Sequence, residues 1–321
     1  MTAPVASDAP AFRVGADENG LGSRLGPMIT TAVLARVEGP GHRLLARRLP
    51  PRLALDLADS KTVVSHTDVR LGEAWARVLA SVQGGGDSTT PAEVFRRLSL
   101  EGEDRLREPC PRHVEPQCWS EAGETFIATE EVVARLRGHT SWLAEQGVQL
   151  LAAKVSVACT RRLNEARRRG QSRFVVDLHA MERLVLRLRE TAGTEVHAVC
   201  GKVGGIGDYA SFFGPLSGRL HVELARGREH SDYHFPGLGR LSFVRDADAH
   251  DPLVMLASLV GKYVRELLMA RVARYYAGAE DDGASLPSGY HDPRTERFVV
   301  ATEALRRRRR VPIACFERAR G

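Results

Sequence analysis

The residues best suited to chemistry are two adjacent acids at the end of a short apolar run. Asp17 and Glu18 follow residues 11–14 and lead directly into a glycine turn at 20–22. Neighbouring side chains on a strand point to opposite faces, so both acids serve one site only if the strand ends or bulges there, as glycine permits. Carboxylate oxygens at a strand end are suitable ligands for Mg²⁺. An acidic surface turn is the alternative explanation for this dipeptide by itself.

Further acids and small polar residues occur in three other segments, near expected strand ends or helix starts. These are Asp59-Ser60-Lys61, the apolar run 174–176 ending on Asp177, and Asp248 with Ala257-Ser258 nine residues beyond it. Four clustered carboxylates would neutralise bound divalent cations, and without metal they would repel one another. Such a group would be suited to binding a hard divalent cation.

Strands and helices that must position these residues alternate along the chain. We expect strands at 11–17, 29–37, 43–47, 147–159, 174–177, 195–200 and 241–244. We expect helices at 69–82, 91–98, 160–169, 181–191 and 252–276. The last of these has Asp251 as its N-cap and Pro252 as its first residue, a common way to begin a helix. The interleaved order predicts an α/β fold, with a mixed sheet flanked by helices.

The domain organisation follows from changes in composition. We expect a disordered N-terminus at 1–10, one domain at 11–276, and a C-terminal helical extension at 277–321 that carries a basic run. A loop-rich insertion or lid is expected at about 84–138, after three consecutive glycines. The five arginines of residues 306–310 indicate either a contact with a phosphate backbone or a flexible basic tail.

The composition is that of a globular protein whose positive net charge is compatible with a polyanionic partner. The 321 residues are 43% hydrophobic and 27% charged, with a formal net charge of +6 and a pI near 9.3. No apolar run approaches the length of a membrane span, and residues 1–10 lack the features of a secretory signal. The five scattered cysteines are therefore expected to be reduced in a cytoplasmic protein.

Several motifs occur in the order that is typical of type 2 ribonuclease H (ribonuclease HII). The segment DENGLGSRLGP at 17–27 resembles that family's DEAGRGPLAGP, in the same register. ASLVGKYVRE at 257–266 resembles part of AASILAKVTRD, and Asp248 stands nine positions before it, as the family's last acid does. Asp59-Ser60-Lys61 is similar to the family's DSK, Val176-Asp177 to its VDG, and Gly289-Tyr290 to a C-terminal Gly-Tyr.

The resemblance implies an RNase H-like fold and two-metal hydrolysis, with Mg²⁺ or Mn²⁺, of the RNA strand of an RNA/DNA hybrid. The four acids that it assigns to metal binding and catalysis are Asp17, Glu18, Asp177 and Asp248. The residues that it assigns to substrate binding are Gly20, Leu21, Gly22, Ser60, Lys61, Ser258, Lys262 and Tyr290. The alternatives for the third acid are Asp208 and Glu223, because 71 positions separate Asp177 from Asp248.

One departure from the family pattern concerns the substrate. Leu21 stands where the family has an arginine, so the guanidinium that could pair with phosphate is absent from this position. A nucleic-acid-binding protein that has lost or weakened catalysis is therefore the second hypothesis.

Three other functional signals carry less weight. A dinucleotide-binding enzyme would need a helix directly after Gly26, where Pro27 and a β-branched run predict a strand. The glycine loop at 201–205 could bind phosphate through its amides or form only a tight strand exit. Cys110, His113 and Cys118 fit no common zinc spacing and are expected to be metal-free.

Overall fold

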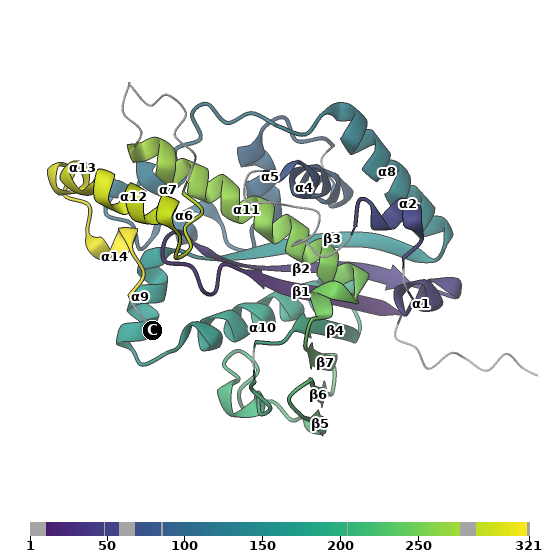
Figure 1. Ribbon diagram of the computed structural model, residues 1–321. Helices are drawn as coiled ribbons and strands as arrows, with labels where there is room; N and C mark the ends of the chain where they lie inside the picture. The colour runs from purple at the N-terminus through teal and green to yellow at the C-terminus, as the bar shows by residue number, and fades with distance from the viewer. Residues whose placement is uncertain are drawn as a thin grey trace, which may run out of the picture.

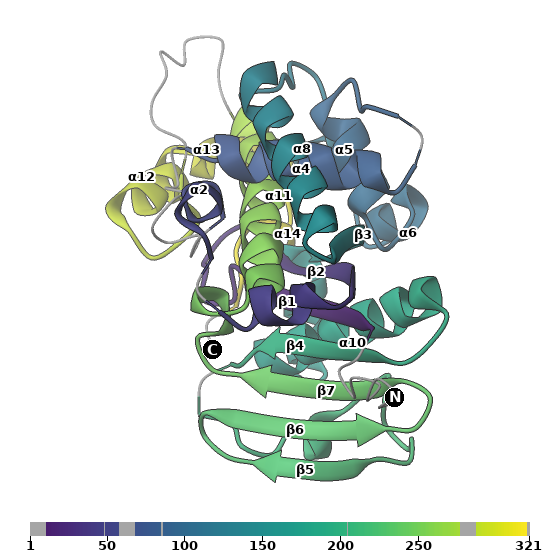
Figure 2. The same cartoon turned by 90° about the vertical axis from the view of Figure 1, so that its right-hand side faces the viewer.

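The computed structural model describes residues 11–47, 49–57, 68–84, 86–203, 205–276 and 287–319. Its centre is a mixed sheet whose seven strands, within these ranges, lie in the order β3-β2-β1-β4-β7-β6-β5 (Figure 2). The strands are β1 (Phe12–Asn19), β2 (Met28–Val37), β3 (Val148–Ala158), β4 (Val196–Gly201), β5 (Val222–Arg226), β6 (His230–Phe235) and β7 (Gly239–Val244).

Strand direction brings the acid-bearing segments to one edge of the sheet. β1 pairs with β2 in antiparallel fashion and with β4 in parallel fashion, and β4 is also parallel to β7. The carboxyl ends of β1, β4 and β7 therefore lie side by side. Asp17 is near the end of β1, and Asp248 lies in the short helix η3 (Ala247–Ala249) that follows β7.

Helices cover both faces of the sheet (Figure 1). One face carries α11 (Pro252–Tyr276), α4 (Arg70–Val82), α5 (Pro91–Leu98) and α8 (Glu130–Glu145), and the other carries α10 (Arg173–Ala192). The remaining helices are α1 (Pro40–Leu45), α2 (Pro51–Ala54), α6 (Glu103–Arg107), η1 (Arg112–Val114), α7 (Pro116–Trp119), α9 (Thr160–Arg168), η2 (Ala210–Phe212), α12 (Pro293–Ala301), α13 (Glu303–Arg308) and α14 (Ile313–Phe316). No helix in these ranges is both long enough and apolar enough to cross a membrane.

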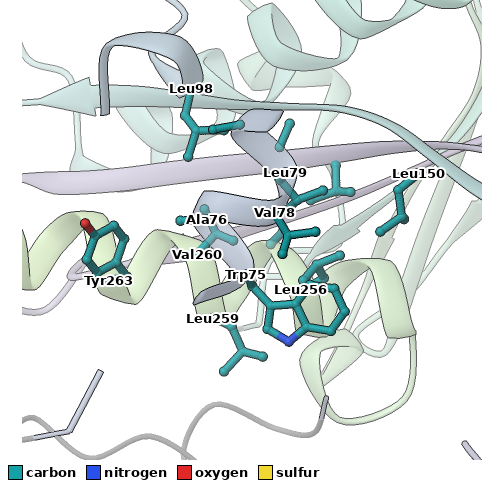
Figure 3. Packing of buried hydrophobic residues seen from close by; sticks show 14 of the residues in the cluster. Trp75, Ala76, Val78, Leu79, Leu98, Leu150, Leu256, Leu259, Val260 and Tyr263 are labelled. Carbon is teal, nitrogen blue, oxygen red and sulfur yellow. The ribbon is translucent and has the colours of Figure 1, made fainter. Parts of the chain in front are cut away.

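The main core lies between the sheet and the α11 face. Trp75 and Leu79 of α4 pack among Leu256 and Leu259 of α11, next to Leu150 of β3 (Figure 3). Each of these side chains is less than a tenth exposed, so the face excludes water. A second apolar cluster fills the space between the sheet and α10.

The start of α11 is fixed to β1, and this contact sets the position of the cleft side chains further along the helix. Asp251 caps the helix, because its Oδ1 accepts hydrogen bonds from the amides of Leu253 (2.9 Å) and Val254 (3.2 Å). Its Oδ2 forms an ion pair with Arg13 of β1 at 2.7 Å. A Cβ atom on Gly15 would lie 2.3 Å from the carbonyl carbon of Leu253, so glycine allows the helix backbone to contact the strand.

The structure confirms the predicted mixed sheet flanked by helices, but two expected strands are wrong. Residues 43–47 overlap α1, which begins at Pro40 because proline is well suited to a first helical position. Residues 174–177 form the first turns of α10, whose N-cap Ser172 accepts a hydrogen bond from the amide of Val175 at 3.3 Å. The β-branched run in this segment favours a strand locally, but the burial of one helical face overrides that preference.

The segment at 84–138 and the C-terminal extension both pack against the domain. Short helices occupy much of the first segment, and its Phe95, Leu98 and Trp119 are buried in the main core. In the second, Arg306 stacks on Phe316 at 4.0 Å and Arg309 stacks on Tyr275 at 4.4 Å. The arginine run therefore begins in a docked helix, and the expected lid is part of the helical layer.

Candidate active site

A cleft of about 470 Å³ opens where the carboxyl ends of β1 and β4 meet η3 and α11. Its lining residues are Asp17, Glu18, Asn19, Gly20, Leu21, Gly22, Gly201, Lys202, Val203, Asp246, Ala247, Asp248, Ser258, Lys262, Arg265, Glu266 and Tyr290. Nine of the residues assigned from the sequence are in this lining: Asp17, Glu18, Gly20, Leu21, Gly22, Asp248, Ser258, Lys262 and Tyr290. Ser60 and Lys61 fall outside the described residues.

Asp17 is the cleft residue on which Glu18, Asp248 and Ser258 all act. Burial raises the pKa of its carboxyl well above the ordinary value, and repulsion from Glu18 and Asp248 raises the pKa further. A hydrogen bond with Ser258 on α11 partly offsets these effects. The end of β1 and the η3–α11 region, which are more than 200 positions apart in the sequence, therefore meet at one carboxylate that is costly to ionise without a cation.

Glu18 points to the opposite face of β1 from Asp17, as alternation along a strand requires. Its Oε2 accepts a hydrogen bond from the amide of Leu21 at 2.9 Å, which fixes the start of the glycine turn. The strand continues to Asn19, so the two acids reach the same cleft around the end of the strand and not through a bulge.

Asp177 is the third acid near this pair, and it comes from a helix and not from the expected strand end. Its side chain is fully buried, and Oδ1 accepts a hydrogen bond from Thr30 Oγ1 at 2.9 Å. Its Oδ2 has no hydrogen-bond partner among the described residues. Burial raises the pKa of Asp177 well above the ordinary value, and the charges of Glu18 and Asp17 add to that effect. Asp177 does not line the cleft but lies behind Glu18.

The strand-end position beside Asp17 on β4 is occupied by a glycine. A Cβ atom on Gly201 would lie 2.7 Å from Asp17 Oδ1, so this position is directly against the carboxylate. The next residue, Lys202, donates hydrogen bonds to Gly227 O (2.7 Å) and Ser231 Oγ (2.6 Å). No carboxylate therefore reaches Asp17 from the end of β4.

The two alternative third acids lie elsewhere. Glu223 of β5 forms an ion pair with Arg226 at 2.8 Å, and Asp208 lies 3.6 Å from the same guanidinium. Neither lines the cleft. The position of Asp177 beside Glu18 therefore distinguishes it from both alternatives.

One face of α11 supplies part of the cleft lining. Ser258, Lys262 and Glu266 are spaced by four residues and so share a face of the helix. Glu266 was not predicted, although its spacing from Ser258 and Lys262 would have identified it. Charged residues on a long helix usually face solvent. Arg265 does not, because it is only 1% exposed and stacks on the Tyr290 ring at 4.5 Å.

The glycine turn leads directly into a strand. Gly20 has a φ of 92° and Gly26 a φ of 77°, a region that favours glycine, and β2 begins at Met28. No helix follows the turn, so the arrangement needed to bind a dinucleotide pyrophosphate is absent from this part of the described structure.

Within the described residues, no three His, Cys, Asp or Glu side chains are close enough together to hold a metal ion. This finding covers Cys110, His113 and Cys118, and Cys110 Sγ instead accepts a hydrogen bond from Trp119 Nε1 at 3.3 Å. The carboxylates at the cleft are hard oxygen donors. The raised pKa of Asp17, and the raised pKa and unpaired Oδ2 of the neighbouring Asp177, fit a divalent cation in charge and chemistry. Their present positions do not form a complete coordination shell.

No family model matches the chain, and no curated protein matches its sequence. Among solved structures, a chain of the PCNA:RNase HII complex from Archaeoglobus fulgidus is 16% identical with a TM-score of 0.43, over 96% of this chain and 94% of that one. The Q54A mutant of Bst-RNase HIII is 15% identical with a TM-score of 0.42, over 92% and 71%. The ribonuclease H2 of Pyrococcus horikoshii OT3 is 12% identical with a TM-score of 0.36, over 95% and 92%.

Proposed function

We propose that this protein is a metal-dependent endonuclease that hydrolyses the RNA strand of RNA/DNA hybrids. The observation that carries the proposal is the convergence of Asp17, Asp248 and Ser258 in one cleft. The same three residues belong to the motifs that resemble ribonuclease HII. Agreement between motif order and spatial convergence supports a shared site, because the three residues span more than 200 positions of sequence.

In this proposal Asp17, Glu18 and Asp248 would hold Mg²⁺ or Mn²⁺, and Asp177 would add negative charge from behind Glu18. When bound, two such ions stabilise charge on the attacking and leaving oxygens of the phosphodiester. Lys262 lines the same cleft, where its ammonium group would attract a substrate phosphate. Tyr290 is held against Arg265 and would contact a sugar.

A nucleic-acid-binding protein with weakened catalysis is the second candidate. Gly201 leaves the strand-end position beside Asp17 without a carboxylate, and Leu21 supplies no charge to the turn. This candidate predicts hybrid binding without cleavage, whereas the endonuclease requires both.

The test is a cleavage panel of uniform RNA/DNA hybrid, DNA with a single ribonucleotide, double-stranded RNA and branched DNA, each with Mg²⁺ or Mn²⁺. We expect cleavage of hybrid to 3′-hydroxyl and 5′-phosphate ends, and loss of cleavage in Asp17→Asn and Asp248→Asn. Asp208→Asn is the matched control, because it removes an acid outside the cleft and should retain activity. Binding without cleavage in either metal would favour the second candidate.

A further inference from the structure

Two arginines from other parts of the chain, the half-buried Arg173 and the buried Arg318, contact the glycine turn at 20–26. Arg173 is the first residue of α10, and Arg318 follows α14 near the end of the described chain. Arg318 is only 3% exposed, although it lies close to the C-terminal end of the described residues. A buried charged side chain therefore lies beneath a turn that lines the cleft.

Arg318 holds both ends of the turn through backbone carbonyls. Its Nη1 donates to Gly20 O at 2.5 Å, and its Nε donates to Gly26 O at 2.9 Å. Arg173 holds the middle of the turn, since its Nη1 donates to Leu21 O at 3.0 Å and to Ser23 O at 3.2 Å. Carbonyl oxygens repel phosphate, so directing them away from the cleft favours an anion on the other side of the turn.

The open side of the turn is free for a ligand. Gly22 is exposed, and a Cβ atom at this position would meet no atom within 4 Å. Gly20, Leu21 and Gly22 all line the cleft that contains the carboxylates. The guanidinium groups are therefore behind the turn and the substrate space is in front of it.

A docked segment, and not a loose tail, delivers Arg318 to this position. The Nδ2 of Asn164 on α9 donates to Ala314 O (3.0 Å) and Glu317 O (2.8 Å), and the amide of Arg318 donates to Arg24 O (3.0 Å). Phe316 is buried beside this segment. With the hydrogen bond from the amide of Ala319 to Asn164 Oδ1 (2.7 Å), these contacts fix the backbone on both sides of the arginine.

The arginines beneath the turn carry positive charge that the protein does not fully neutralise. Burial and the neighbouring Arg173 and Arg265 lower the pKa of Arg318 to about 9. Its Nη2 is buried and has no hydrogen-bond partner among the described residues. A neutral donor could bond the same carbonyls without this electrostatic cost, so the retained charge points to an anionic ligand above the turn.

We infer that Arg318 is a positioning residue for a substrate phosphodiester. It holds the carbonyls of the turn away from the cleft and supplies, from beneath, the positive charge that Leu21 does not provide. This inference rests on the proposed function and makes the C-terminal segment a part of the nucleic-acid site.

The first test is the steady-state kinetics of hybrid cleavage by Arg318→Ala. We expect KM to rise about tenfold while kcat changes less than about threefold, because substrate positioning is lost and the carboxylates are untouched. Free guanidinium ion at millimolar concentration should lower the KM of this variant again. Arg309→Ala is the matched control, since Arg309 anchors the same extension on Tyr275 and does not touch the turn. An unchanged KM in Arg318→Ala would overturn the inference.

Arg318→Lys keeps the test decisive if the alanine variant does not fold. A single ammonium group retains the charge but lacks the planar fork that reaches Gly20 O and Gly26 O together, so we expect an intermediate KM.

Fluorescence anisotropy of a labelled hybrid without divalent metal tests the role of Arg318 separately from the proposed endonuclease function. Absence of cleavage by the unmodified chain would refute the proposed function. Binding by the Arg318 variants that is as tight as that of the unmodified chain would refute the role of Arg318.

Discussion

Asp177 shows how much the site depends on the placement of single carboxylates. Its Oδ2 is unpaired among the described residues and its neighbours are acids, so the ionised form is destabilised in the metal-free protein. Among the described residues, Thr30 donates the one hydrogen bond that this carboxyl accepts. A residue in this environment lowers stability without metal and contributes negative charge to a bound cation.

We therefore expect Asp177→Asn to have opposite effects on stability and activity. Without metal, the melting temperature should rise by a few degrees, because about 1 kcal/mol of repulsion is removed and this shifts melting by roughly 2 to 4 °C. Metal-dependent cleavage should fall about tenfold to a hundredfold, as for other groups that act behind direct ligands. Thermal melts and initial rates measure the two effects. Equal activity of the variant and the unmodified chain would remove Asp177 from the site.

At the scale of elements, the sequence predicted the parts whose local signals agree with their packing. The β-branched residues after Pro27 predicted β2, and Asp251 with Pro252 predicted the start of α11. The start of α10 could not be predicted, because Val175 and Val176 favour a strand locally. Only the burial of Leu178, together with residues further along the helix, reveals the helical face.

The same limit applies to the site. The resemblance to ribonuclease HII implied that Asp17, Asp248 and Ser258 serve one site, and all three line one cleft. The contacts of Arg318 could not be predicted, because they depend on how the C-terminal segment docks against the turn. No spacing rule relates residues that are almost 300 positions apart.

The contact between α11 and β1 gives a prediction at this scale. Gly15→Ala should destabilise the fold by about 3 kcal/mol, because the new methyl group would lie 2.3 Å from the Leu253 carbonyl carbon and would push the helix off the strand. Gly138→Ala is the matched control: the same change at an exposed position of α8 meets no atom within 4 Å. It should stabilise the fold by about 0.5 to 1 kcal/mol. Urea unfolding measures the free energy of unfolding of both variants. Equal changes in the two would show that α11 can shift to accommodate the methyl group at position 15.

At the scale of the whole molecule, acids gathered at one sheet edge link stability to pH and to metal. The pKa values of Asp17 and Asp177 are raised in the folded state, so the folded state binds protons more tightly than the unfolded state does. Their favourable contribution is present at low pH and is lost as the pH rises through the folded-state pKa values. A divalent cation favours the ionised carboxylates and should reverse this loss.

We predict that Mn²⁺ raises the melting temperature, and more at about pH 8 than at about pH 5. At a concentration near 100 times its dissociation constant, the gain should be about 2.7 kcal/mol. Differential scanning calorimetry with and without Mn²⁺ measures the shift, and Asp17→Asn should abolish most of it. A shift of the same size in Asp17→Asn would place the binding site elsewhere.

The most direct test of the central claim is cleavage of a uniform RNA/DNA hybrid in Mg²⁺ or Mn²⁺ by the unmodified chain, Asp17→Asn and Asp208→Asn. The proposal predicts metal-dependent cleavage of the RNA strand that falls by about a hundredfold or more in Asp17→Asn and persists in Asp208→Asn. Full activity in Asp17→Asn, or no cleavage by the unmodified chain in either metal, would contradict it.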